Sequence, residues 1–164
     1  MNRFKFLSGF FLILSFVVPY TACKEAKNST IETVKPVFVK EGQLSIFTPT
    51  TDSLVVELAI EFAETEYETQ TGLMYRDALK EYEGMLFVFS ESALHSFYMK
   101  NTQIPLDILF IDENFEIVSI HENAEPFNET GISSKVPVRY VLEINAGLTQ
   151  KWGISVGDRI AIQK

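Results

Sequence analysis

The segment SLVVELAIEF (residues 53–62) alternates its side chains between two faces, and no other feature constrains the fold as strongly. Leu54, Val56, Leu58 and Ile60 fall on one face of an extended chain, and the two glutamates of the segment fall on the other. A period of two residues is typical of a β-strand with one buried face. Such a strand is stable only within a sheet that packs against a second layer, so the segment indicates a β-rich domain.

Further short strands are predicted along the chain, with turn signals between them. Residues 49–52 (PTTD) and the pair Glu113-Asn114 predict turns, the second one inside a hairpin. Thr71 is expected to cap a short helix that runs to residue 79 or 80, and AGLTQKWG suits one or two helical turns. The other predicted strands cover residues 43–48, 85–89, 95–100, 106–112, 115–122, 136–145 and 157–163. Long helices do not alternate with these strands. The pattern therefore predicts a mostly β fold: an antiparallel β-sandwich (jelly-roll-like) or a partly closed barrel with one or two short helices.

The first 22 residues have the layout of an export signal. Arg3 and Lys5 precede an apolar run over residues 6–18, which ends at Pro19. The run is short for a membrane span, which needs about 20 apolar residues. We therefore expect residues 1–22 to be a signal peptide, with a permanent anchor helix as the alternative.

Cys23 is the only cysteine of the chain, so it cannot form an internal disulfide. It follows small residues at the end of the signal, as the lipidated cysteine of a bacterial lipoprotein does, although Tyr20 stands where such sites usually have Leu. We expect lipid on Cys23 to hold the protein on a membrane of the cell envelope, on the periplasmic or cell-surface face. The alternative is ordinary cleavage that leaves a free thiol.

The remaining chain divides into a polar tether and one domain. Residues 23–41 are charged and without periodicity, which predicts a flexible tether, and residues 42–164 suit a single β-rich domain. The net charge of −8 disfavours nucleic acid as a partner. With one cysteine and two histidines, a zinc site of the usual ligands is not expected, and no motif calls for a cofactor. The oligomeric state has no signal in the sequence.

The stretch FYMKNTQIPLDILFID (residues 97–112) sets Lys100, Asn101 and Asp107 among apolar neighbours. If the side chains of 106–111 alternate, both faces of this strand are largely apolar. A carboxylate such as Asp107 is costly there unless it is paired or hydrogen-bonded. Lys100, Arg76 or backbone N–H groups of the loop are its candidate partners.

Two interpretations of these polar residues remain open. In the structural one, they hold together a turn that Pro105 closes. In the functional one, they lie at the mouth of a pocket that binds a small polar or carbohydrate-like ligand. The candidate ligand-binding residues of that pocket are Arg76, Tyr98, Met99, Lys100, Asn101, Asp107 and Glu143.

Catalytic signals are weaker. Lys100 and Asp107, with Glu143, could serve acid–base chemistry, but no nucleophile elbow or oxyanion-hole motif is present. His95 and Ser96 with an aspartate have the residue types of a catalytic triad, but no motif supports that role. We therefore expect a binding or accessory module, with an acid–base enzyme and a purely structural or partner-binding envelope protein as alternatives.

Four segments, in this order, closely resemble one known family. They are TGLMYRDALKEYEGMLFVF, FYMKNTQIPLDILFID, VLEINAG and GISVGDRI. The similarity to the domain of unknown function 192 family runs from about Leu54 to Ala161, with Tyr98 where the family usually has Trp. The resemblance implies a small, mostly β fold of sandwich or jelly-roll type, and it implies no function.

Overall fold

The computed structural model describes residues 35–164, which form one compact unit. The predicted signal peptide, Cys23 and much of the predicted tether lie outside the described residues. Within the described part, no helix is both long and apolar enough to cross a bilayer.

Nine strands and two short helices make up the described chain, which confirms the predicted mostly β fold. The helices are α1 (Glu66–Thr71) and α2 (Leu148–Trp152). The strands are β1 (Gly42–Phe47), β2 (Leu54–Ala63), β3 (Glu83–Ala93), β4 (Ser96–Phe97), β5 (Leu106–Ile111), β6 (Ile117–Ala124), β7 (Ile132–Ser133), β8 (Val138–Asn145) and β9 (Arg159–Gln163).

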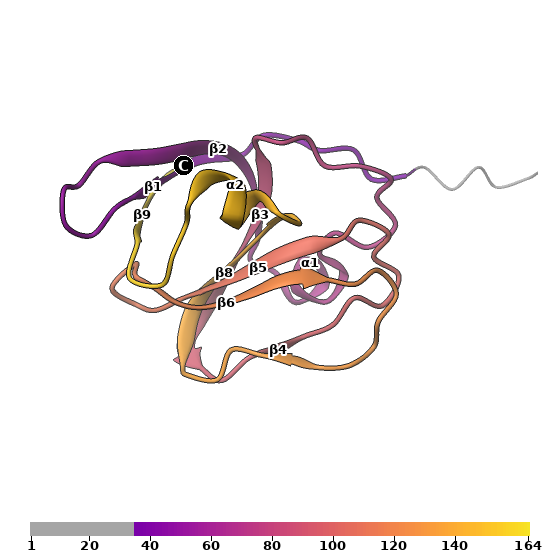
Figure 1. The fold of residues 1–164 in the computed structure, drawn as a ribbon. Coiled ribbons are helices and arrows are strands. Elements are labelled where there is room, and N and C mark those ends of the chain that lie inside the picture. Colours follow the sequence, from indigo (N-terminus) through magenta and orange to yellow (C-terminus); the bar gives the residue numbers. More distant parts are fainter. Residues whose placement is uncertain (1–34) are drawn as a thin grey trace, which may run out of the picture. The chain divides into compact units, whose positions relative to one another are not determined.

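Seven of the strands form one curled sheet in the order β6-β5-β8-β3-β2-β1-β9 (Figure 1). Its ladders are antiparallel except for the parallel pair β2–β3, which requires the crossover that carries α1. The two edges meet at one end, where Glu116 bridges to Arg159 and the Ile117 N–H donates to the Asp158 carbonyl at 2.8 Å. The sheet is therefore a partly closed barrel, one of the two predicted forms.

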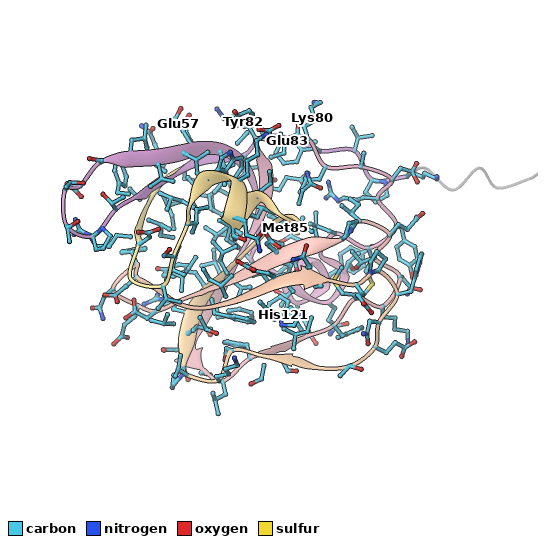
Figure 2. All side chains as sticks on the ribbon, in the orientation of Figure 1. Glu57, Lys80, Tyr82, Glu83, Met85 and His121 are labelled. Atoms are coloured by element: carbon cyan, nitrogen blue, oxygen red, sulfur yellow. The ribbon has the colours of Figure 1, made fainter. Side chains whose placement is uncertain are left out.

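The inner face of the sheet carries the larger apolar core. Every strand of the large sheet contributes to it, and Leu148 and Ile154 close it from the α2 side, with Trp152 packed against them. Full burial of one such aliphatic side chain stabilises the fold by about 1.5–3 kcal/mol. This core makes the barrel interior a packed layer (Figure 2).

The outer face of β3, β5 and β8 is covered as well. Leu73, Leu79, Met99 and Ile104, from the segments before β3 and β5, pack against this face. All residues of β5 are consequently buried, with Leu109 and Ile111 in the inner core and Leu106, Ile108 and Phe110 in the outer one. The predicted alternation of β5 between two apolar layers is confirmed.

Two local predictions were wrong. The helix expected to begin at Thr71 ends there instead, because Thr65 and Glu68 form a capping box that starts α1 earlier. Gly72 then adopts a φ of +48° and ends the helix. The strand expected over residues 95–100 is limited to β4, because the chain turns after it, with the Thr102 N–H bonded to the Met99 carbonyl at 3.1 Å.

Asp107 connects three elements from a fully buried position. The Thr149 N–H and hydroxyl both donate to its Oδ2, at 3.0 and 2.7 Å, and the Asn123 N–H donates to Oδ1 at 2.9 Å. Gly147, the N-cap of α2, has no side chain to cap the helix, so the Asp107 carboxylate takes that role. The partners suggested from the sequence, Lys100 and Arg76, pair with Glu129 and Glu61 instead.

We expect Asp107→Asn to lower the free energy of unfolding by about 2–4 kcal/mol, because an amide group replaces an acceptor oxygen and leaves buried donors without a partner. Urea unfolding followed by circular dichroism measures the loss. Asp77→Asn is the control: Asp77 forms an exposed ion pair with Lys35, and its loss should change stability by about 0.5 kcal/mol or less. Equal effects of the two substitutions would contradict a structural role for Asp107.

Candidate functional site

A cavity of about 250 Å³ lies on the outer face of the sheet, between α1, β3, β4 and β8. Its walls are mainly apolar and aromatic, and polar atoms come from α1, from β4 and the residues beside it, and from Glu143 of β8. The lining residues are Thr69, Gln70, Thr71, Gly72, Leu73, Met74, Phe87, Phe89, His95, Ser96, Phe97, Tyr98, Thr102 and Glu143.

The register of the sheet places Glu143 in a buried row of side chains. Glu61 of β2 pairs with Met85 of β3, Met85 with Glu143 of β8, and Glu143 with Ile108 of β5. Paired residues point to the same face, so these four side chains cross the outer face in line. The end of α1 lies over this row.

Gly72 allows the chain to approach the row closely. A Cβ atom at this position would lie 2.9 Å from Cζ of Phe87 and 3.9 Å from Oε2 of Glu143. Any side chain larger than hydrogen would therefore press on Phe87, besides being strained at φ +48°. Gly72 thus forms the wall that separates this cavity from the next one.

Glu143 is the unusual group of the cavity. The residue is only 6% exposed, and within residues 35–164 its carboxyl group has no hydrogen-bond or ion-pair partner; its oxygens are not fully buried and reach the cavity. Burial raises the pKa of this carboxyl group to about 8. Near neutral pH the group is thus largely protonated and can donate a hydrogen bond into the cavity.

His95 is a second titratable group of the cavity, and one of its ring atoms is unsatisfied. Its ring stacks on Phe89 with the centroids 3.6 Å apart, and its Nε2 is buried without a hydrogen-bond partner in the described chain. Burial lowers the pKa of His95, opposed by a contact with the Val138 backbone, so the neutral imidazole is favoured.

The structure brings together only some of the residues predicted as a site. Tyr98 and Glu143 line the cavity, as does Met74. Met99 is buried in the outer core beneath it and does not line it. Asn101 lies outside the cavity and donates to the Tyr75 hydroxyl at 2.9 Å.

The predicted charged residues are dispersed. The side chain of Lys100 is half exposed and lies 3.9 Å from Glu129. Arg76 is buried in an adjoining cavity, where its Nη2 lies 2.7 Å from Oε2 of Glu61. The two cavities share Thr71 and Gly72 as lining residues.

Asp107 and Glu143 lie on opposite faces of the sheet. Asp107 pairs with Ile144, whereas Glu143 pairs with Ile108, so the two carboxyl groups point away from each other. Asp107 and Glu143 therefore do not form the acid–base pair considered from the sequence, because two such carboxyl groups would have to flank one bond of the substrate.

His95, Phe87 and Phe89 line the cavity but were not among the site residues predicted from the sequence. Alternation along MLFVF places Phe87 and Phe89 on the same face as Met85, and that pattern was the available signal. What the pattern lacks is the position of the covering segment. The segment that covers this face is the crossover between β2 and β3, which carries α1. Its path in the structure leaves part of the aromatic face open to the cavity.

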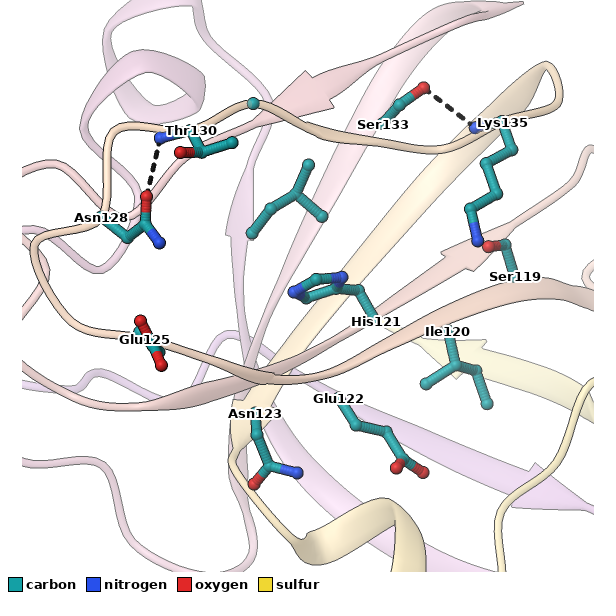
Figure 3. A pocket seen from close by; sticks show the side chains of 12 residues that line it. Ser119, Ile120, His121, Glu122, Asn123, Glu125, Asn128, Thr130, Ser133 and Lys135 are labelled. Carbon is teal, nitrogen blue, oxygen red and sulfur yellow. Dashed lines mark hydrogen bonds between the residues drawn. The ribbon is translucent and has the colours of Figure 1, made fainter.

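A second cavity, of about 510 Å³, lies between β6 and the loop after it (Figure 3). His121 projects from β6 toward this loop, whereas Glu122 projects to the other side and accepts a hydrogen bond from Gln150 of α2 at 3.0 Å. The residues that line this cavity are exposed or half-exposed, and several bond within their own loop, as Asn128 does with the Thr130 N–H. Such groups are satisfied by water, so the Glu143 cavity is the better candidate site.

Stability should depend on pH through Glu143. The unfolded chain releases this proton near pH 4.5 and the folded one near pH 8, so the folded state loses stability as pH rises between these values. We expect Glu143→Gln to equal the wild type near pH 5 and to exceed it by about 2–5 kcal/mol near pH 9. Urea unfolding at both pH values measures this difference.

The control for this prediction is Glu57→Gln on the exposed face of β2, which removes a glutamate of the same size. It should leave the pH profile of the free energy of unfolding as in the wild type. A profile of Glu143→Gln that runs parallel to that of the wild type would show that the native carboxyl group titrates normally.

Comparisons with known proteins place this architecture. Residues 47–162 match the model of the DUF192 family, described as "Uncharacterized ACR", and no curated protein matches the chain. A solved structure from Sinorhizobium meliloti 1021, described as a "putative transcription regulator", is 40% identical with a TM-score of 0.71, covering 74% of this chain and 92% of that one. A protein of unknown function from Novosphingobium aromaticivorans DSM 12444 is 35% identical with a TM-score of 0.69, covering 73% and 83%.

The family match spans most of the described domain, from the end of β1 to β9, and it includes the segments that form the cavity. The two solved structures are similar to this chain in sequence and in fold over about three quarters of its length. This chain therefore belongs to the domain of unknown function 192 family.

Proposed function

We propose that this protein is a small-ligand-binding or accessory module of the cell envelope, and that the Glu143 cavity is its binding site. One observation carries the proposal: a buried carboxyl group without a partner lines an apolar cavity. Placing a carboxyl group in such a largely apolar setting without a hydrogen bond is costly. Groups of this kind concentrate at functional sites.

The chemistry of the walls favours a ligand with an apolar part and one polar group. Leu73, Met74, Phe87 and Phe97 offer dispersion contacts, and Glu143 offers a directed polar contact. Of the small polar or carbohydrate-like ligands expected from the sequence, a carbohydrate fits less well, because each of its hydroxyls needs a partner that the apolar walls do not supply.

The arrangement supports binding over the acid–base enzyme considered as an alternative. Lys100 is turned toward Glu129 at the surface, and Asp107 is buried on the opposite face with its acceptors occupied. The two groups named for proton transfer therefore do not reach one substrate. The net charge of the chain, −8, also disfavours DNA binding.

The proposed location rests on the N-terminal sequence. A signal peptide over residues 1–22 and a lipid on Cys23 would hold the domain on a membrane surface. The polar residues that follow would separate the domain from the headgroups, and the fold starts at Gly42 with β1.

Methyl NMR provides a direct test of the cavity. The chain has four methionines, of which Met74 lines the cavity, Met85 lines the adjoining one, and Met99 is buried elsewhere. In the full chain labelled at the methionine methyl groups, small apolar–polar fragments should shift the Met74 signal first. Ser96→Trp places an indole at the rim of the cavity and should weaken this response about tenfold or more.

Leu94→Trp is the matched control, because Leu94 is exposed near β4 and does not line the cavity. It should leave fragment binding unchanged. Fragments that shift Met85 or Met99 without Met74, or that ignore Ser96→Trp, would assign binding to another part of the molecule.

The membrane anchor has its own test. In bacteria that express the full chain, Cys23→Ala should move the protein from the membrane fraction to the soluble one, because lipid attachment requires the thiol. Fractionation and immunoblotting measure the distribution. A variant that stays in the membrane fraction as an uncleaved precursor would favour the anchor helix instead.

A further inference from the structure

We infer that the Glu143 cavity binds an organic cation, an ammonium group carried on a small apolar body. This inference rests on the proposed function and names the ligand class for the same cavity. It follows from the aromatic walls, from the unpaired carboxyl group and from the positions of the neighbouring charges.

The walls of the cavity are rich in aromatic rings. Phe87, Phe89, Phe97 and Tyr98 all line it, and Phe97 meets Phe87 edge-to-face with the ring centroids 5.0 Å apart. The faces of such rings carry negative partial charge, which attracts ammonium groups. Aromatic cages are a common way to hold methylated ammonium ions. Here Phe89 is stacked on His95, so Phe87, Phe97 and Tyr98 are the rings left to contact such an ion.

Glu143 supplies the complementary charge. Neutral when the cavity is empty, the carboxyl group can ionise when a cation lies beside it, because the new ion pair offsets the cost of burial. A neutral ligand gains no such pair, and an anion would be repelled by the ionised form. The group therefore discriminates in favour of cations.

The charges that pack around Glu143 do not already satisfy it. Arg76, in the adjoining cavity, pairs with Glu61, and on β3 the Glu83 carboxylate binds Lys80. On α1, Glu68 accepts the Thr65 N–H of the capping box. His95 and Tyr98 are the titratable groups that share the cavity, and burial favours the neutral form of His95.

The size of the cavity limits the ligand to a small molecule. A cavity of about 250 Å³ accommodates a small molecule. A trimethylammonium group with a short tail fits this volume. The negative net charge of the chain also raises the local concentration of cations at its surface.

Cation binding must be coupled to a proton. Because Glu143 has to release its proton to pair with the cation, the Kd should fall about tenfold per pH unit from pH 6 to pH 7.5 and level off above about pH 8. A quaternary ammonium does not titrate, so the pH dependence reports on the protein alone. Proton release on binding, seen as a buffer-dependent heat, should follow the same profile.

The test compares three probes of one shape and different charge. Choline is the cation, 3,3-dimethyl-1-butanol its neutral isostere, and 3,3-dimethylbutanoate the matching anion. Each is added at about 10 mM to the methionine-labelled full chain near pH 8.5. Choline should shift the Met74 methyl signal with a Kd at least about tenfold below that of the alcohol, and the anion should not bind.

Glu143→Gln should weaken choline binding about tenfold or more and abolish its pH dependence. Glu57→Gln removes a charge at an exposed position of β2 that does not line the cavity (Glu57 is labelled in Figure 2), and it should change neither. Since Glu143→Gln is expected to fold at least as well as the wild type, loss of binding in this variant reports on the site.

The outcomes separate this inference from the proposed function. If the alcohol binds as tightly as choline or more tightly and shifts the Met74 signal, the proposed binding site is supported and the preference for a cation is overturned. Tighter binding of the anion would likewise overturn the preference for a cation. It would point to Arg76 as the anion's partner, because its Nε and Nη1 are buried without partners in the described chain. If neither these probes nor any fragment shifts Met74, both proposals fail.

Discussion

The hydrogen bonds to the Asp107 carboxylate are the interaction on which the rest of the architecture depends. They fasten α2 to β5 and to the edge strand β6, and α2 in turn closes the inner core at one end of the barrel. A buried carboxylate is tolerated only when its oxygens are occupied, and here each oxygen has a donor. Asp107 therefore stabilises the inner side of the sheet, and its hydrogen bonds place no constraint on the residues of the outer side.

Glu143 shows the opposite solution one strand away. It lies on the neighbouring strand β8 and faces the outer layer, where the described residues offer no donor and no cation. The two acidic groups thus illustrate how one register difference separates a structural carboxylate from a candidate ligand-binding one. In Asp107 the fold supplies the partners, and in Glu143 we propose that a ligand does.

The sequence predicted most of the strands, the two-sided burial of β5 and the short helix α2, because these depend on local periodicity and turn residues. It misplaced the helix before β3, because Thr65 and Glu68 compete with Thr71 as a start signal. The parallel pairing of β2 with β3 has no local signal at all. The predicted site combined residues that do not belong together, because proximity along the chain grouped Lys100, Asn101 and Asp107. In the structure Lys100 and Asn101 lie in the turn after β4, whereas the register of β5 buries Asp107 on the inner face.

The pairing of β1 with β9 joins the first and last strands of the domain, residues 43–47 with 159–163. Contacts between such distant parts of a chain are formed late, because a long loop must close first. The barrel can complete its inner core only after β9 has left the ribosome. Until then β1 is an open strand edge, which can pair with other chains.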